Sequence, residues 1–103
     1  MRKAFKMKLY SNKKEEDTKR HNPIWMELET VLRQQSVSNY SLFLDEETHI
    51  LFGYAEIEDA QKWNEIANTE ICKKWWEFMA DSMKTNPDNS PKSWNLEEVF
   101  HIN

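Results

Sequence analysis

The chain has 103 residues, charges of both signs with a net charge of −4, and an aromatic content of 13% that includes five tryptophans. This length predicts one domain, residues 1–103, with a modest core. The charge pattern lacks the long basic patch typical of nucleic-acid binding, and no apolar run approaches the roughly 20 residues of a membrane span. We therefore expect no nucleic-acid partner and no membrane. The only cysteine, Cys72, cannot form an internal disulfide, which favours the reducing cytoplasm.

The first two predicted elements are a strand and a helical segment. Residues 3–10 alternate in polarity, which predicts a half-buried strand. Its apolar side carries Phe5, Met7 and Leu9. Residues 12–35 follow helical spacing, interrupted at Pro23, and proline disfavours the α conformation in the residue before it. The segment is one kinked helix, or two helices meeting at Asn22, with Asn22 as N-cap and Pro23 as the first helical residue. In both cases His21 lies at the break.

Residues 39–58 show the pattern of a β-hairpin with the polar turn "DEET" at residues 45–48. One face of the first arm carries Tyr40, Leu42 and Leu44. The second arm is apolar on both faces, with Ile50, Phe52 and Tyr54 on one and Leu51, Ala55 and Ile57 on the other. Gly53 is the only glycine in the chain, and a glycine inside a strand predicts a bulge or the close approach of another group.

The remaining segments predict a second helical region, a loop and a last strand. Residues 59–83 carry apolar side chains at helical spacing, and Asn68 and Thr69 are suited to cap a restart in the middle. Residues 86–93, "NPDNSPKS", have the composition of a loop. Residues 96–102, "LEEVFHI", predict a short final strand.

The predicted order β-α-β-β-α-β is that of the ferredoxin-like α+β fold, an antiparallel sheet with its helices on one face. Such a sheet leaves its other face uncovered. Phe5, Tyr40, Phe52 and Tyr54 make the sheet too apolar for one face to stay in water. We therefore expect a homodimer in which the two sheets pack face to face.

Among the three histidines, His21 is the strongest candidate for chemistry. An imidazole has an ordinary pKa of about 6.5 and can give or take a proton near neutral pH. The alternative is a surface histidine at a frayed turn. His49 lies beside the hairpin turn and His101 near the carboxyl end, and we expect no role for either. Three scattered histidines and the distant Cys72 do not form a metal motif, so we expect no metal.

Three further positions are candidates for a binding site around His21. Trp75 and Trp76 are about 100° apart on a helix, so one fits the core while the other lies at a rim and offers a stacking platform. The alternative is two packing residues. The Tyr40 hydroxyl is a polar group on the uncovered sheet face, or Tyr40 is a plain interface residue. Asp17, one turn before His21, either orients the imidazole or is one more charge on a solvated face.

The motifs together resemble one enzyme family. "RKAF" near the start, "RHNPIW" at residues 20–25, "NY" at 39–40, the double tryptophan of "CKKWWEFM", "NPDNSP" at 86–91 and "EVF" at 98–100 are similar to the L-rhamnose mutarotase family from end to end. The resemblance implies a dimeric ferredoxin-like fold. It also implies cofactor-free interconversion of the α and β anomers of L-rhamnose.

By this resemblance His21 is the catalytic acid or base, and Tyr40, Trp75 and Trp76 contact substrate. Family members carry a sugar-contacting tyrosine four residues before the histidine, where this chain has Asp17. That role does not carry over, so the substrate is L-rhamnose or a related 6-deoxy or manno-configured sugar. Two alternatives remain at this stage: a haem-degrading or quinol-type monooxygenase on the same dimeric fold, and a non-catalytic sugar-binding module.

Overall fold

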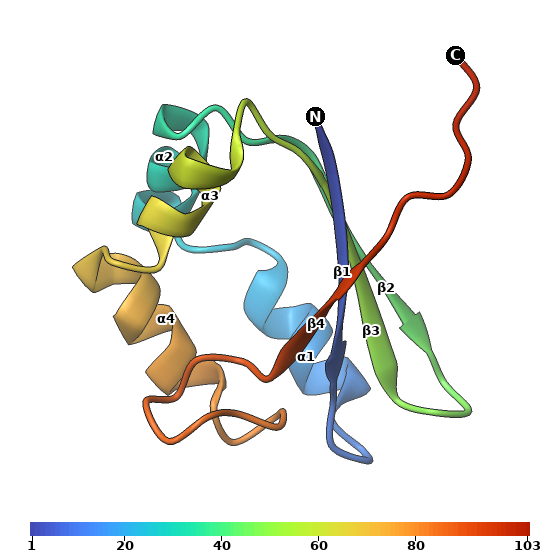
Figure 1. The fold of residues 1–103 in the computed structure, drawn as a ribbon. Coiled ribbons are helices and arrows are strands. Elements are labelled where there is room, and N and C mark those ends of the chain that lie inside the picture. The colour runs from blue at the N-terminus through green and yellow to red at the C-terminus, as the bar shows by residue number, and fades with distance from the viewer.

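A computed structural model describes all 103 residues and shows an antiparallel sheet with helices on one of its faces (Figure 1). The element order is β1 (Arg2–Lys8), α1 (Lys14–His21), α2 (Met26–Gln34), β2 (Ser38–Asp45), β3 (Ile50–Glu56), α3 (Ala60–Ile66), α4 (Glu70–Met79) and β4 (Ser93–Leu96). The strands lie in the order β2-β3-β1-β4. This arrangement confirms the predicted ferredoxin-like α+β class.

The break at Asn22 separates two helices, but Asn22 does not start the second one. Its backbone N–H donates to the Lys19 carbonyl, and its side chain donates to the Thr18 carbonyl at 2.7 Å, so Asn22 closes α1 instead. Helix α2 begins only after Trp25, whose side chain makes no capping bond. The predicted N-cap role of Asn22 and the helical start at Pro23 are therefore wrong, because residues 23–25 form the connection between the helices.

The second helical region also divides, as the cap residues predicted. The Thr69 hydroxyl accepts a hydrogen bond from the Cys72 amide at 3.3 Å and starts α4. The Asp59 carboxylate does the same for α3 through the Lys62 amide at 2.8 Å. Each cap satisfies one of the amides that a helix N-terminus leaves free. The restart at Thr69 turns α4 so that Trp75 and Met79 face inward.

The last strand lies earlier than predicted. Strand β4 is Ser93–Leu96 and pairs with β1 from Met7 back to Ala4. Only two residues of β1 remain beyond that register, and the chain after Leu96 leaves the sheet (Figure 1). The predicted strand at 96–102 is therefore wrong. In its place Glu98 forms an ion pair with Arg2 at 2.6 Å, and Val99, Phe100 and Ile102 are exposed.

The core lies on the helix-covered face of the sheet, and its tightest point is Gly53. Strand β1 contributes Phe5, Met7 and Leu9 to the core, and β3 contributes Leu51 and Ala55. Phe5 pairs with Gly53 across the strands, and a Cβ on Gly53 would lie 2.4 Å from the Phe5 ring. Only glycine lets the ring lie flat over the backbone. The predicted close approach at Gly53 is confirmed.

The uncovered face carries Phe52 as predicted, but two other residues predicted for it do not lie there. Tyr40 lies on the helix side, where its ring is 6.2 Å from that of Phe5, so assigning these two residues to the uncovered face was wrong. Strand β3 carries apolar side chains on both faces, so periodicity alone does not tell which of its faces the helices cover. The outward residues with large exposed side chains are Phe43, Phe52, Trp94 and Leu96.

The Gly53–Phe5 contact predicts a stability effect. Gly53→Ala should lower the free energy of unfolding by about 1–3 kcal/mol, because the new methyl group forces the Phe5 ring to move. Urea unfolding measures this. Ser41→Ala, at an exposed position on the neighbouring strand, is the control and should unfold as the wild type does. Equal stability of the Gly53→Ala and wild-type proteins would contradict the contact.

Candidate active site

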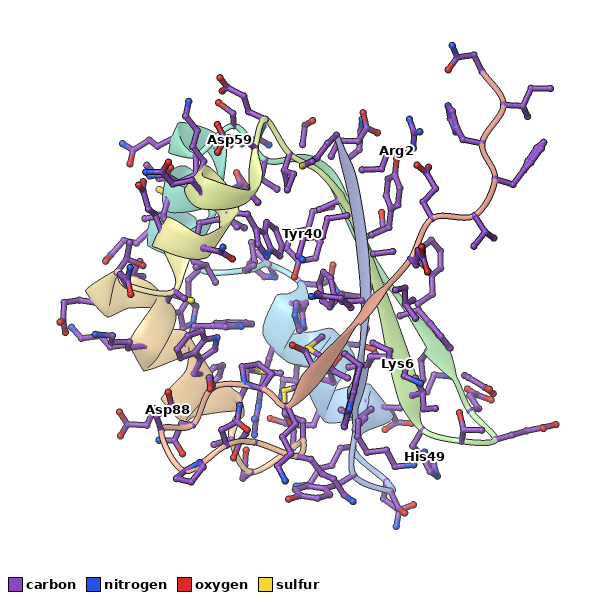
Figure 2. All side chains as sticks on the ribbon, viewed as in Figure 1. Arg2, Lys6, Tyr40, His49, Asp59 and Asp88 are labelled. Carbon is purple, nitrogen blue, oxygen red and sulfur yellow. The ribbon has the colours of Figure 1, made fainter.

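Between the sheet and the helices lies an open hollow of about 1430 Å³. His21 from α1, Tyr40 from β2, and Trp75 and Trp76 from α4 all line it. Figure 2 shows Tyr40 directed from the strands toward the helices. The structure thus brings the four sequence candidates to one cavity, although three separate elements carry them.

The His21 ring is held by its own helix. His21 is the last residue of α1, and its Nδ1 lies 2.8 Å from the backbone oxygen of Asp17. A carbonyl oxygen only accepts, so Nδ1 carries a proton and donates it. Nε2 has no hydrogen-bond partner in the protein and is therefore the nitrogen that can gain or lose a proton at the hollow.

The two stretches "KRHNPIW" and "CKKWWEFM" meet at Trp75. The His21 ring packs edge-on to the indole of Trp75, with centroids 5.2 Å apart and planes at 79°. Trp25 packs on Trp75 in the same manner at 5.1 Å and 85°. Edge-to-face contacts of this kind hold both rings in defined orientations. The break at Asn22 thus lets His21 and Trp25, on either side of it, contact one tryptophan.

The tryptophan pair divides into an inner and an outer residue. Trp75 is buried and belongs to the core, whereas Trp76 is half-buried and packs against the core from its edge. Both line the hollow. This division is the one that their 100° separation predicted, with Trp76 at the rim.

Tyr40 belongs to a second aromatic wall that the sequence did not reveal. Its ring lies 5.8 Å from that of Trp63, which in turn lies 5.8 Å from Phe5. Tyr40 is 39% exposed, but its exposed surface faces the hollow. The surrounding protein disfavours the phenolate and raises the pKa of Tyr40, so the residue presents a neutral hydroxyl. Trp63 followed the helical apolar pattern, which marks core and cavity positions alike.

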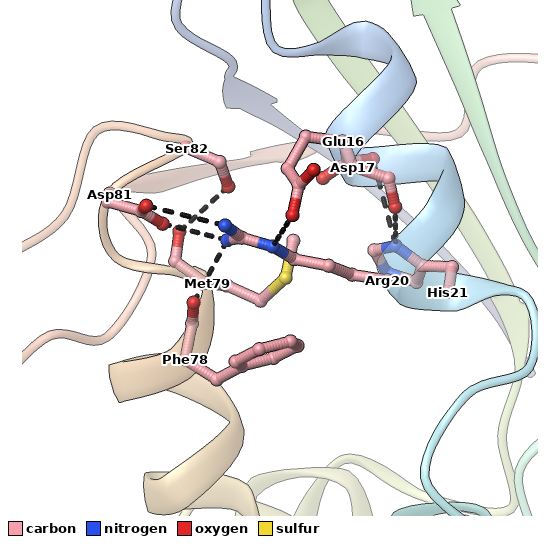
Figure 3. A network of polar contacts seen from close by, with 8 residues as sticks. All are labelled: Glu16, Asp17, Arg20, His21, Phe78, Met79, Asp81 and Ser82. Atoms are coloured by element: carbon pink, nitrogen blue, oxygen red, sulfur yellow. Dashed lines mark hydrogen bonds and ion pairs between the residues drawn. The ribbon is translucent and has the colours of Figure 1, made fainter.

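Arg20, the residue before His21, ties α1 to the end of α4 (Figure 3). Its guanidinium donates to both carboxylate oxygens of Asp81, at 2.7 and 3.3 Å, and to the Phe78 carbonyl at 2.9 Å. Its Nε donates to Glu16 at 2.9 Å, and its charge lies 4.8 Å from the centre of the Phe78 ring. Acidic partners on two sides raise the pKa of Arg20, which stays charged.

Asp17 lies inside the protein and not on a solvated face. The residue is 7% exposed, and its Oδ2 is 3.7 Å from Nδ1 of His21. Its Oδ1 is buried without any hydrogen-bond partner. Burial raises the pKa of Asp17, while the nearby His21 and Arg20 act in the opposite direction. Contact with the imidazole therefore comes from both the backbone and the carboxyl group of Asp17.

The other titratable candidates lie elsewhere or are inert. His49 is at the hairpin turn, where its carbonyl accepts from the Leu9 amide at 2.9 Å, and His101 is exposed near the carboxyl end. Burial raises the pKa of the Cys72 thiol to about 11. No three His, Cys, Asp or Glu side chains gather closely enough to hold a metal ion. None of the helices is both long and apolar enough to span a membrane.

Comparison with known proteins identifies the family. Residues 2–102 match the family model described as L-rhamnose mutarotase. The chain belongs to the L-rhamnose mutarotase family. It is 56% identical over 102 residues to the L-rhamnose mutarotase of Lachnoclostridium phytofermentans, with 99% of this chain and 98% of the relative covered. It is 53% identical, with the same coverage, to that of Clostridium beijerinckii. The resemblance inferred from the motifs is confirmed, and with it the assignment to the isomerases.

Solved structures agree with the fold. The crystal structure of an L-rhamnose mutarotase from Formosa agariphila superimposes with a TM-score of 0.92 at 48% identity, covering 100% of this chain and 99% of that one. A putative antibiotic biosynthesis monooxygenase from Nitrosomonas europaea gives a TM-score of 0.64 at 12% identity, covering 96% of this chain and 98% of that one. That second likeness shows a shared fold alone. The mutarotase relatives therefore decide between the two enzyme classes that the sequence left open.

Proposed function

We propose that the protein interconverts the α and β anomers of L-rhamnose in the hollow, with His21 as the group that moves the proton. The observation that carries this proposal is the state of the imidazole. Its Nδ1 proton is committed to the Asp17 carbonyl, and its Nε2 has no protein partner beside the hollow. A nitrogen held in this way can accept a proton and return it without the ring turning over.

The chemistry needs two proton transfers and no exchange of electrons with another compound. His21 removes the proton of the anomeric hydroxyl, and the bond between C1 and the ring oxygen breaks as a proton reaches that oxygen. The open chain holds an aldehyde at C1. Rotation about C1–C2 exposes its other face, and ring closure reverses both transfers. Positioned proton transfer contributes roughly 10²–10⁴-fold for each group, and one histidine serves both steps in turn.

The aromatic walls suit a sugar of this kind. Trp75 packs beside His21, Trp76 lines the hollow as well, and Tyr40 and Trp63 form a separate cluster in its wall. Indole and phenol rings pack on the apolar C–H faces of a pyranose, and the C6 methyl group of rhamnose adds a further apolar surface. We propose that Tyr40, Trp75 and Trp76 contact the substrate. L-rhamnose is the proposed substrate, and a related 6-deoxy or manno-configured sugar is a second candidate, because Asp17 changes the polarity of the site.

We further propose that two copies pair through the uncovered sheet face. Phe43 is 64% exposed there, and Phe52, Trp94 and Leu96 lie on the same face. Exposed large apolar side chains gathered on one face are costly in water and are typical of an interface. In this proposal each chain acts as a single domain, residues 1–103, in the reducing cytoplasm, where the unpaired Cys72 stays a thiol.

The role of His21 is tested by removing its ring. His21→Ala should stay folded, and exchange between α- and β-rhamnose, followed by saturation-transfer NMR, should fall by roughly two to four powers of ten. His49→Ala, at the distant turn, is the matched control and should exchange at the wild-type rate. A folded His21→Ala protein with wild-type exchange would show that another group moves the proton. Absence of wild-type exchange with every sugar tested would refute the mutarotase proposal.

The two tryptophans should differ in what their loss changes. Trp75→Ala should lower the free energy of unfolding by about 3–5 kcal/mol, because it removes a buried ring from the core. Trp76→Ala should leave stability closer to that of the wild type and raise the apparent KM for rhamnose. Thermal melts and exchange kinetics on both variants separate the two effects. Wild-type kinetics in both would argue against an aromatic wall for the sugar.

Pairing through the sheet predicts the molecular mass in solution. Light scattering at micromolar concentration should give about twice the chain mass of 12.5 kDa. Phe43→Glu places a charge on the proposed interface and should yield the monomer mass. Met26→Glu is the control, since Met26 is 82% exposed on α2 and lies away from that face. A wild-type monomer, or dissociation by Met26→Glu alone, would contradict this interface.

A further inference from the structure

Asp17 carries a buried carboxyl group that the fold leaves incompletely paired. Its neighbours in sequence find partners or water: Glu15 is exposed, and Glu16 binds Arg20. Asp17 is 7% exposed, and its Oδ1 has no hydrogen-bond donor at all. A buried polar atom without a partner is rare and is unfavourable for the folded state. Because Asp17 lines the hollow beside His21, we look for its partner among the groups of the active site.

The charges around Asp17 single out His21. His21 is the only basic side chain within 4.0 Å of the carboxylate, at 3.7 Å. Arg20 acts from farther away, and its hydrogen bonds go to Glu16, Asp81 and Phe78. An oppositely charged neighbour for the carboxylate therefore appears beside Oδ2 when the imidazole takes up a proton.

The remaining titratable groups that line the hollow do not supply that partner. From β2, Tyr40 is neutral, and from α4 the Cys72 thiol is neutral as well, since both pKa values are raised. Lys14 on α1 is paired with Glu46. Lys3, Arg33, Lys73, Glu29 and Asp88 also line the hollow, but none forms a salt bridge with Asp17.

This inference rests on the function proposed for His21. We propose that Asp17 is a positioning residue whose carboxylate stabilises the His21 imidazolium during the reaction. When Nε2 takes the proton of the anomeric hydroxyl, the O–H bond breaks, an N–H bond forms, and positive charge spreads over the ring to Nδ1. Nδ1 faces Oδ2 of Asp17. The interaction is stronger with the cationic ring than with the neutral ring, and interactions of that kind increase the rate.

The buried Asp17 carboxyl group also lowers the stability of the folded protein when it ionises, and this effect can be measured. The folded protein raises the pKa of Asp17, so between the unfolded and the folded pKa it holds a proton that the unfolded chain has already lost. The contribution of Asp17 to stability is full below the unfolded pKa of about 3.9 and is lost as the pH rises through the folded value. Asp17→Asn should therefore gain thermal stability relative to the wild type as the pH rises from about 4 toward neutral.

The test compares Asp17→Asn, which keeps the shape and removes the charge, with Glu15→Gln, which removes an exposed carboxylate from the same helix. Without sugar, NMR should show the His21 imidazole of Asp17→Asn titrating about one pH unit lower than in the wild type, with His49 and His101 unmoved. The rate of exchange between rhamnose anomers should fall by about tenfold, the factor that corresponds to one pH unit. The acidic limb of the pH profile of exchange should move to lower pH. Glu15→Gln should match the wild type in every measurement.

Asp17→Glu, which keeps a carboxylate, should restore the wild-type imidazole titration at least in part. An unchanged titration in Asp17→Asn would overturn the inference, even if exchange slows, because a purely structural role would produce slower exchange alone. If Asp17→Asn does not fold, the wild-type protein provides the test. The inference is overturned if the NMR signals of the His21 ring do not respond when the Asp17 carboxyl group ionises. A shifted titration in a protein that exchanges no sugar would refute the proposed function while confirming the Asp17–His21 pair.

Discussion

The arrangement around the hollow depends on Arg20, which joins α1 to the last turn of α4. Its guanidinium stays charged, binds Asp81 through two hydrogen bonds and lies against the Phe78 ring. The Phe78 carbonyl that it also binds belongs to the negative end of the helix dipole, where a cation is favourable. Because His21 follows Arg20 and Trp75 lies one turn before Phe78, this junction sets the contact between the two rings.

A second constraint shapes the opposite wall. Gly53 lets the Phe5 ring lie flat on β3, and that ring supports Tyr40 and Trp63. The two walls come from different parts of the fold: one from α1 and α4, the other from β1, β2 and α3. The ring contacts fall into two separate sets, and none joins one wall to the other. A site held on both sides by packed rings requires little ordering when a ligand enters.

Local sequence patterns predicted the helices and most of the strands, but they did not predict how these elements pack against one another. Helical and alternating spacing, the break at Asn22 and the cap at Thr69 are short-range signals, and they matched the structure. The face taken by Phe5 and Tyr40 was assigned wrongly, because β3 is apolar on both faces and its pattern does not show which face the helices cover. Strand β4 was placed too late, because its position depends on the register with β1, about 90 residues earlier. The motifs located His21, Trp75 and Trp76, whereas the wall at Trp63 depends on contacts that no spacing reveals.

The hydrogen bonds of Arg20 also determine which groups surround the Asp17 carboxylate. In sequence it belongs to a run of charges that resembles a solvated face, and Arg20 follows it three residues later on the same helix. The structure directs that guanidinium to Asp81 and Phe78, on the far side of the junction, and to Glu16. The bond that fixes the end of α1 thus deprives the Asp17 carboxylate of a direct partner. What remains within reach is an imidazole whose charge changes as it moves a proton, so the junction that places His21 also leaves a carboxylate that responds to its charge.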